Sequence, residues 1–85
     1  MDNELHKAVH VALKFADQRR AHPVMRELEQ NRSVAVHLLR GRVAPEESWF
    51  ELEVTGAASR VDALIRLTAR LGAAIHPLPP LASTA

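Results

Sequence analysis

The chain has 85 residues and a formal net charge of +1, and 47% of its residues are hydrophobic. This length predicts one small domain, and the apolar share is sufficient for a core without metal or disulfide cross-links. Because the sequence has no cysteine, it excludes disulfides, thiolate catalysis, cysteine-bound zinc and iron–sulfur clusters. The balanced charge gives no reason to expect nucleic acid as a partner.

The two ends of the chain give expectations about location and domain limits. No apolar run approaches the roughly 20 residues of a membrane-spanning helix. The first four residues, Met-Asp-Asn-Glu, lack the basic and then apolar layout of a signal peptide, so we expect a cytoplasmic protein. We expect residues 1–4 to be a flexible N-terminus, residues 5–78 to form the domain and residues 79–85 to be a flexible C-terminal tail.

The first half of the chain predicts a strand, a helix and a second strand. Apolar and polar residues alternate from Leu5 to Phe15, as in a half-buried strand. Proline is tolerated at the first helical position, so a short helix is expected to begin at Pro23 and to end near residues 31–33. Alternation returns in the second strand, over residues 34–43, which contains a bend marked by Gly41.

The second half predicts a strand, a helix and a strand. Residues 49–56 alternate again after a turn at residues 45–47, and Gly56 ends that strand. Ser59 and Asp62 have the spacing of a capping box and open a helix, which Gly72 ends. Residues 73–78 form a last strand, and its prolines suit a sheet edge.

The order strand, helix, strand, strand, helix, strand predicts an α+β protein with the ferredoxin-like split βαββαβ plait. This plait has a four-stranded antiparallel sheet with both helices on one face. Right-handed crossovers would bring the first and third strands to the centre of the sheet.

Residues 34–43 also carry a family resemblance. His37-Leu38-Leu39 stands where the NIL domain, a small ferredoxin-like module, has its name-giving Asn-Ile-Leu, and Gly41 matches a glycine that commonly follows. Residues 23–28 resemble the first helix of that family, residues 50–56 its third strand and residues 61–75 its second helix and last strand. His37 replaces the asparagine, which is a departure from the family pattern.

The resemblance implies a module that acts by binding. NIL domains usually lie at the C-terminus of methionine-importer ATPases, where they dimerise, bind the transported amino acid and inhibit the ATPase. Others are joined to ferredoxin segments. This chain has neither a phosphate-binding loop of the form Gly-x-x-x-x-Gly-Lys-[Ser/Thr] nor cysteines for a cluster, so it resembles a free-standing NIL domain.

The alternation also predicts a polar open face of the sheet. If the apolar residues of the strands face the helices, the opposite face carries four histidines (His6, His10, His37 and His76), together with Glu51, Glu53, Lys14 and Trp49. Imidazole and carboxylate suit zinc, nickel or copper, with His10 and His76 as the metal candidates. The alternatives, which we favour, are histidines paired with glutamates or facing a partner chain, with some pH sensitivity near six.

We interpret Trp49, with Leu39 and Val43 also expected on the open face, as an interface or ligand-stacking anchor. Arg40 and Arg42 are expected on a solvated rim. No nucleophile and base are paired, and adjacent glutamates point to opposite faces of a strand, so we expect no enzyme and no cofactor.

Two functions remain open. The first is a regulatory module that binds a small molecule, such as the amino acid methionine, at a homodimer interface; its site candidates are His37, Leu38, Leu39, Gly41 and Trp49. The second is a dimeric adaptor that docks on a larger protein without a small ligand. Both use the edge strand at residues 34–43 for dimerisation.

Overall fold

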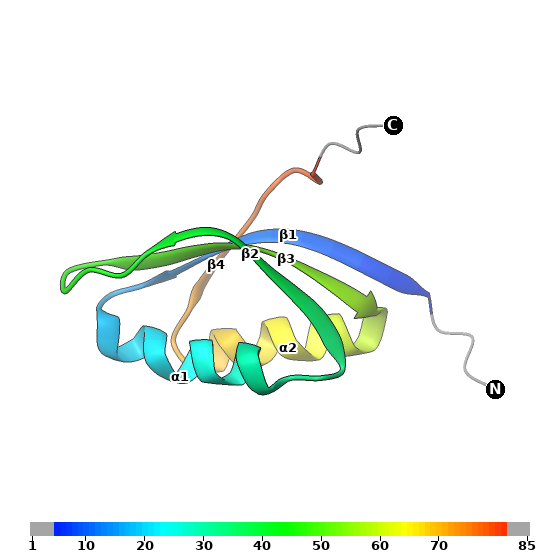
Figure 1. Cartoon of the computed structure of the whole chain (residues 1–85), viewed down its shortest axis with the longest axis horizontal. Helices are drawn as coiled ribbons and strands as arrows, with labels where there is room; N and C mark the ends of the chain where they lie inside the picture. The colour runs from blue at the N-terminus through cyan, green and yellow to red at the C-terminus, as the bar shows by residue number, and fades with distance from the viewer. Residues whose placement is uncertain (1–4, 82–85) are drawn as a thin grey trace.

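The computed structural model describes residues 5–81 and has the βαββαβ order that the sequence predicts (Figure 1). Residues 1–4 and 82–85, which were expected to belong to the flexible ends, lie outside the described residues. The elements are β1 (His6–Phe15), α1 (Gln18–Gln30), β2 (Val34–Arg42), β3 (Ser48–Ala57), α2 (Ala58–Arg70) and β4 (Ala74–Pro77).

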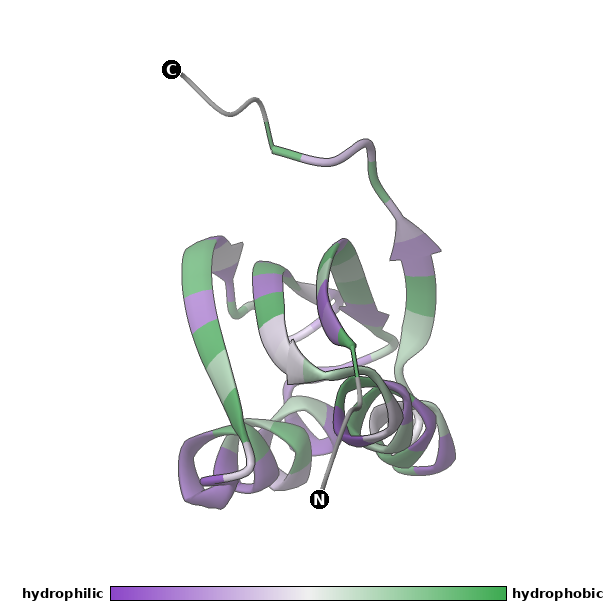
Figure 2. Cartoon of the chain, turned by 90° about the vertical axis from the view of Figure 1, so that its right-hand side faces the viewer, coloured by the Kyte–Doolittle hydropathy of each residue, from purple (hydrophilic) through white to green (hydrophobic). Residues whose placement is uncertain are grey.

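The four strands form one antiparallel sheet in the order β2-β3-β1-β4. Both helices lie against one face of this sheet, and the other face is open (Figure 2). The ferredoxin-like plait is therefore confirmed, including the central position of β1 and β3. No helix within residues 5–81 combines the length and the apolar composition needed to cross a membrane.

The two central strands set the faces of the sheet. β1 and β3 pair over ten residues, from His6 opposite Ala57 to Phe15 opposite Ser48, without a break in register. Since successive side chains point to opposite faces, this ladder directs one set of residues to the helices and the other to the open face. Within residues 5–81, the buried polar residues are Ser48 at the start of β3 and Thr68 of α2. Both hydroxyls donate to backbone carbonyls.

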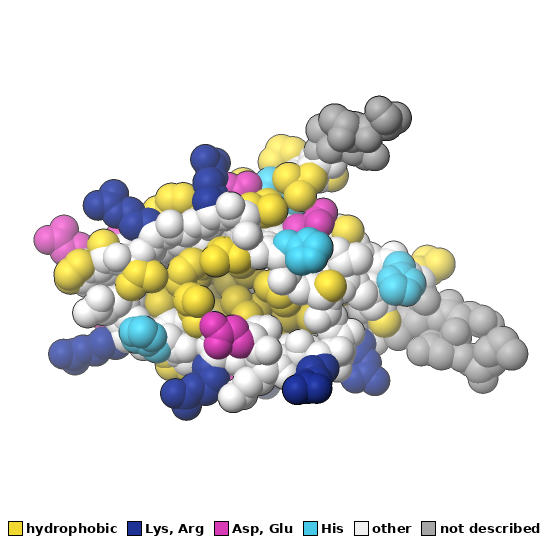
Figure 3. All heavy atoms as spheres, viewed as in Figure 1, with side chains coloured by type: hydrophobic (Ala, Val, Ile, Leu, Met, Phe, Trp, Pro, Cys, Tyr) yellow, Lys and Arg dark blue, Asp and Glu magenta, His cyan; other side chains and the backbone are white. Residues whose placement is uncertain are grey.

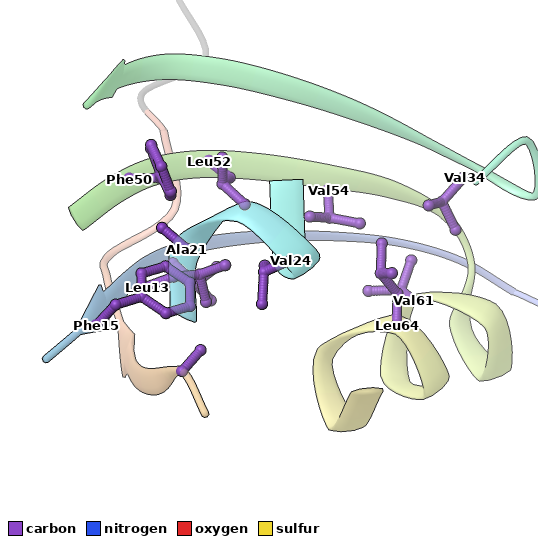
Figure 4. Packing of buried hydrophobic residues seen from close by; sticks show 12 residues of the cluster. Leu13, Phe15, Ala21, Val24, Val34, Phe50, Leu52, Val54, Val61 and Leu64 are labelled. Atoms are coloured by element: carbon purple, nitrogen blue, oxygen red, sulfur yellow. The ribbon is translucent and has the colours of Figure 1, made fainter. Parts of the chain in front are cut away.

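The core lies between the sheet and the two helices (Figure 4). Its centre is aliphatic, and Phe15 and Phe50 meet edge to face with ring centroids 5.8 Å apart. The residues that contribute to it from the strands and the helices are Val11, Leu13, Phe15, Val34, Phe50, Leu52, Val54, Ala21, Val24, Val61 and Leu64, with Ala73 beside them.

The start of α1 differs from the prediction. The helix begins at Gln18, five residues before Pro23, because the Asp17 carboxylate accepts a hydrogen bond from the backbone N–H of Arg20 (3.1 Å) and caps the first turn. Pro23 therefore lies inside the helix and leaves the carbonyl of Arg19, an exposed residue, without its helical donor. The predicted end is confirmed, since Asn31 is the C-cap residue.

The start of α2 also differs. Ala57 is the N-cap residue and offers no side-chain cap, so Ser59 lies within the first turn and is not the N-cap residue. Asp62 forms an ion pair with Lys7 of β1 at 2.8 Å in place of the expected capping role. The stop is confirmed, because Gly72 follows the helix with φ of 109°, a backbone conformation that favours glycine.

β2 contains a β-bulge that breaks the predicted alternation. Its register against β3 shifts between Leu38 and Arg40, so Leu39 has no partner of its own and the faces of the following residues exchange. Arg40 and Arg42 lie on the open face opposite Glu51 and Trp49, instead of on a rim. The bulge therefore breaks the strict alternation from which the open-face positions of Leu39 and Val43 are expected, and both side chains are exposed.

Removing Leu13 from the core should destabilise the protein. Its side chain is 0% exposed at the centre of the cluster, and a buried Leu→Ala change typically costs about 3–5 kcal/mol through lost burial and the cavity left behind. We expect this loss for Leu13→Ala in urea unfolding. The same change at Leu5, which is 80% exposed, should cost less than about 0.5 kcal/mol. Equal losses at the two positions would contradict the described core.

Candidate functional site

The open face of the sheet carries the polar side chains that the sequence predicts. The pairs His10 with Glu53, His37 with Glu53 and Ala12 with His76 place three of the histidines on the face turned away from the helices. His6, Lys14, Trp49 and Glu51 lie on the same face by the same register. The bulge adds Arg40 and Arg42 to them.

Three of these groups form a hydrogen-bonded chain across the sheet, together with a backbone carbonyl of the segment after β4. The His10 Nε2 lies 2.6 Å from Glu51 Oε2, and the Arg40 Nε donates to the other oxygen of Glu51, also at 2.6 Å. On its other side, the His10 Nδ1 lies 2.6 Å from the carbonyl oxygen of Pro79. This chain joins β2, β3, β1 and the segment after β4 into one polar cluster, with Glu51 at its centre.

The cluster fixes the protonation of its members. Both ring nitrogens of His10 face an oxygen acceptor, so both carry a proton when both hydrogen bonds form. The bond to the Pro79 carbonyl, and then the bond to Glu51, raise the pKa of His10 above its ordinary value of 6.5. The bonds from Arg40 and then from His10 lower the pKa of Glu51 below its ordinary value of 4.5.

The two metal candidates do not form a metal site. Both nitrogens of His10 are engaged with oxygens, so the ring has no free lone pair for a metal ion. His76 lies diagonally across the β1–β4 ladder from His10 and is exposed. Within residues 5–81, no group of three or more histidine, aspartate or glutamate side chains is placed to hold a metal.

A second feature is an apolar groove between α1 and β2. Figure 3 shows it as a hollow of hydrophobic side chains with a carboxylate at its border. Its cavity has a volume of about 190 Å³. The side chains that line it are Met25, Leu28 and Glu29 of α1, Val36 and Leu38 of β2, and Phe50 and Leu52 of β3.

The five candidate site residues lie in four different places. Leu38 lines the groove and is 55% exposed, whereas His37 lies on the open face with its ring nitrogen 3.9 Å from Glu53. Leu39 lies at the bulge and is exposed. Gly41 and Trp49 lie near the far end of the β2–β3 pair, opposite Phe50 and Arg42 respectively. They do not converge on one pocket.

Gly41 has a structural role at this position. A Cβ atom there would lie 2.7 Å from Cδ1 of the Phe50 ring and 3.1 Å from the carbonyl oxygen of Trp49. Phe50 is buried, so its ring cannot move away freely. The absence of a side chain at Gly41 therefore lets β2 lie directly against the Phe50 ring, which packs on Phe15 in the core.

Trp49 is half-buried on the open face, between Lys14 of β1 and Arg42 of β2. It borders a shallow hollow whose other walls are Arg42, Ala44, Glu46 and Glu47. The sequence prediction of an outward tryptophan is confirmed. Trp49 lies at the opposite end of β3 from Thr55 and Gly56.

Sequence reasoning did not find several residues of these two features. The sequence predicts Arg40 on a rim because the bulge that turns it toward Glu51 has no signature in the residue pattern. It predicts Pro79 in the tail, although the Pro79 carbonyl contacts the sheet. Met25 and Leu28 fall within the helix that the sequence predicts after Pro23, but their position beside the exposed part of β2 follows only from tertiary packing.

Comparison with known proteins adds no relative. No family model, no curated protein and no solved structure matches this chain. The site is therefore interpreted from its own geometry.

Adding a side chain at Gly41 should destabilise the domain. We expect Gly41→Ala to lower the free energy of unfolding by about 1–3 kcal/mol, because the new methyl group overpacks the buried Phe50 ring. Chemical denaturation followed by Trp49 fluorescence measures this change. Arg42→Ala on the same strand is the control, since Arg42 is exposed, and it should change stability by less than about 0.5 kcal/mol. An unchanged stability of Gly41→Ala would contradict the close approach.

Proposed function

We propose that this chain is a non-enzymatic, regulatory binding module that pairs with a second copy through the outer edge of β2. We further propose that the groove between α1 and β2 receives a small apolar amino acid, with methionine as the first candidate. The observation that carries this proposal is the position of the groove, which lies directly beside an unpaired strand edge.

The edge of β2 favours self-association. In the described part of the chain β2 pairs with β3 alone, so its other side presents free backbone N–H and C=O groups over much of nine residues. Leu38, Leu39 and Val43 are exposed along this same strand and its end. Apolar side chains beside unpaired backbone groups are the usual features of a partner surface.

The groove suits a small apolar side chain. Its volume of about 190 Å³ lies below the roughly 300–1,000 Å³ of pockets that hold drug-sized molecules. Its walls are apolar apart from Glu29, and Met25 supplies a polarisable thioether that adapts to the shape of a ligand. These features fit the side chain of an amino acid such as methionine.

The charges explain why the ligand and the dimer are proposed together. The Glu29 carboxylate could pair with the ammonium group of a free amino acid. The described lining contains no cation for the ligand's carboxylate. A buried carboxylate without a partner is strongly disfavoured, so a second copy at the β2 edge would have to complete the site.

The resemblance to the NIL domain supports the same function. It implies a module that dimerises and binds an amino acid, and residues 34–43, which carry the resemblance, include the whole of the edge strand β2. His37 departs from the family pattern, and in this chain it points to the open face, away from the groove. The ligand proposal therefore rests on the groove and does not require His37.

The dimer should depend on Leu38. We expect light scattering at tens of micromolar protein to give a dimer for the natural chain and a monomer for Leu38→Lys, because an ammonium group placed on an apolar contact would lose its water. Leu5→Lys is the control: Leu5 lies before β1 and is exposed, and this variant should remain dimeric. A natural chain that is monomeric under these conditions would refute the dimer.

Amino-acid binding can be measured separately by isothermal titration with methionine, leucine and alanine. We expect heat for methionine, less for leucine and none for alanine, because alanine leaves the groove empty. Glu29→Gln should weaken binding by about tenfold or more through the loss of the ammonium partner. Absence of heat for every amino acid at millimolar concentration would exclude this part of the proposal.

A second candidate function is a dimeric adaptor without a small ligand. The observation that favours it is that the exposed leucines and the strand edge form a continuous open surface, which an extended segment of another protein could extend as an additional strand. A dimer that gives no heat with any amino acid would favour this function. A dimer that binds methionine would favour the first.

A further inference from the structure

The segment that follows β4 is fastened to the sheet through His10. After Pro77 the chain rises on the open side of the sheet (Figure 2). The Leu78 N–H donates to the carbonyl oxygen of His10 at 2.8 Å, and the Pro79 carbonyl lies 2.6 Å from His10 Nδ1. We call residues 78–81 the strap.

The proline content of the strap makes the histidine contact important. Proline has no backbone N–H, and residues 77, 79 and 80 are all proline. Leu78 is therefore the one residue from 77 to 80 that can donate a main-chain hydrogen bond to β1. The side chain of His10 supplies a second attachment in the opposite direction, from the sheet to the strap.

The strap forms one wall of a groove along the outer edge of β1. This groove has a volume of about 440 Å³ and is a different cavity from the one beside β2. Leu78 and Pro80 of the strap line it together with Val9, Ile65 and Ile75. Movement of the strap would therefore change the access to this apolar groove.

Charged groups surround His10 on every side of the open face. Glu51 and Glu53 of β3 are the nearest: the first is bonded to the ring, and the second lies directly opposite on the ladder. Arg40 of β2 reaches Glu51 from the other side, and His37 of β2 lies 3.9 Å from Glu53. His76 of β4 is a diagonal neighbour of His10.

Other charged residues near His10 lie further along β1 or at the groove. His6 and Lys14 lie two side chains away from His10 on the same face of β1. At the border of the groove, Lys7 and Asp62 are paired with each other, and Arg66 lies beside them. The carboxylates of Glu51 and Glu53 therefore favour a positively charged His10 ring. The charge of Arg40 is paired with Glu51.

Loss of a ring proton cannot leave both contacts of His10 intact. A neutral imidazole has one N–H, whereas two oxygens lie 2.6 Å from its nitrogens. The Glu51 carboxylate is the stronger acceptor because it is charged, so it retains the remaining N–H. The lone pair of Nδ1 then faces the Pro79 carbonyl oxygen, and these two acceptors repel each other.

We propose that the strap is a proton-operated latch, in which doubly protonated His10 holds residues 79–81 against the sheet and loss of one ring proton releases them and widens the groove at Pro80, while the main-chain bond of Leu78 to His10 is retained. The segment that covers the groove is thus part of this chain. The state of the groove depends on the protonation of one histidine.

The direction of the pH dependence follows from the two pKa changes. The pKa of His10 is raised, so the stability that its contacts contribute is complete below pH 6.5 and is lost as pH rises through the folded-state pKa. The pKa of Glu51 is lowered, so its contribution is complete above pH 4.5 and is lost as pH falls through its folded-state pKa. The latch is therefore fully closed between pH 4.5 and pH 6.5, and it opens as the pH rises through the folded-state pKa of His10.

Nuclear magnetic resonance of the isotope-labelled chain tests this directly. The ring nitrogens of His10 and the carbonyl carbon of Pro79 are followed from about pH 5 to about pH 9, a range that brackets histidine titration. We expect both to change with one common midpoint above 6.5 and the Cα–H order parameter of Leu81 to fall below about 0.6 at high pH. A Pro79 carbonyl that does not shift while His10 titrates would overturn the latch.

Three variants identify the responsible histidine. His10→Gln should abolish the Pro79 titration step, whereas His37→Gln and His76→Gln, which change other histidines of the same face, should retain it. A step that persists in His10→Gln, or that disappears in His76→Gln alone, would contradict the proposal. Should His10→Gln fail to fold, the common midpoint in the natural chain still decides the question.

Discussion

The unbroken ten-residue register between β1 and β3 is the constraint on which the rest of this structure depends. It directs Val11, Leu13 and Phe15 to the helices and leaves the histidines and glutamates together on the open face. A slip by one residue would exchange the two faces, bury charged side chains and expose the core. The large cost of that exchange fixes the position of His10 opposite Glu53 and beside Glu51, and therefore the geometry of the polar cluster.

The sequence was a good guide wherever local patterns decide the structure. Alternation in residues 5–15 and 49–56 predicts the two central strands, which the structure places at His6–Phe15 and Ser48–Ala57, and the face of their side chains. Gly72 marks the end of α2 because few other residues adopt its φ of 109°. It was a poorer guide where a local signal competes with another. Pro23 suggested a helix start, but the Asp17 cap begins the helix earlier and the helix accepts the proline in its interior.

The candidate site depends on contacts that no local pattern encodes. Arg40 meets Glu51 only because the bulge at Leu39 rotates the end of β2, and the groove exists only because α1 packs beside the exposed part of that strand. The histidine-rich face was predictable from alternation, but the acceptor on the second nitrogen of His10 was not, since it comes from a carbonyl 69 residues further along the chain. Every residue has a backbone carbonyl, so no residue pattern marks the one that will accept a hydrogen bond.

The two edges of the sheet are chemically unequal, and this limits how the molecule can assemble. β4 has four residues and is followed by prolines, so its edge offers few donors to another strand. The edge of β2 is longer and open, but the bulge interrupts its regular spacing. If two copies joined their β2 edges symmetrically, the other edge of each sheet, formed by β4 and by the residues of β1 before Val11, would be a different surface. The prolines after β4 thus act against fibre growth as well as shaping the strap.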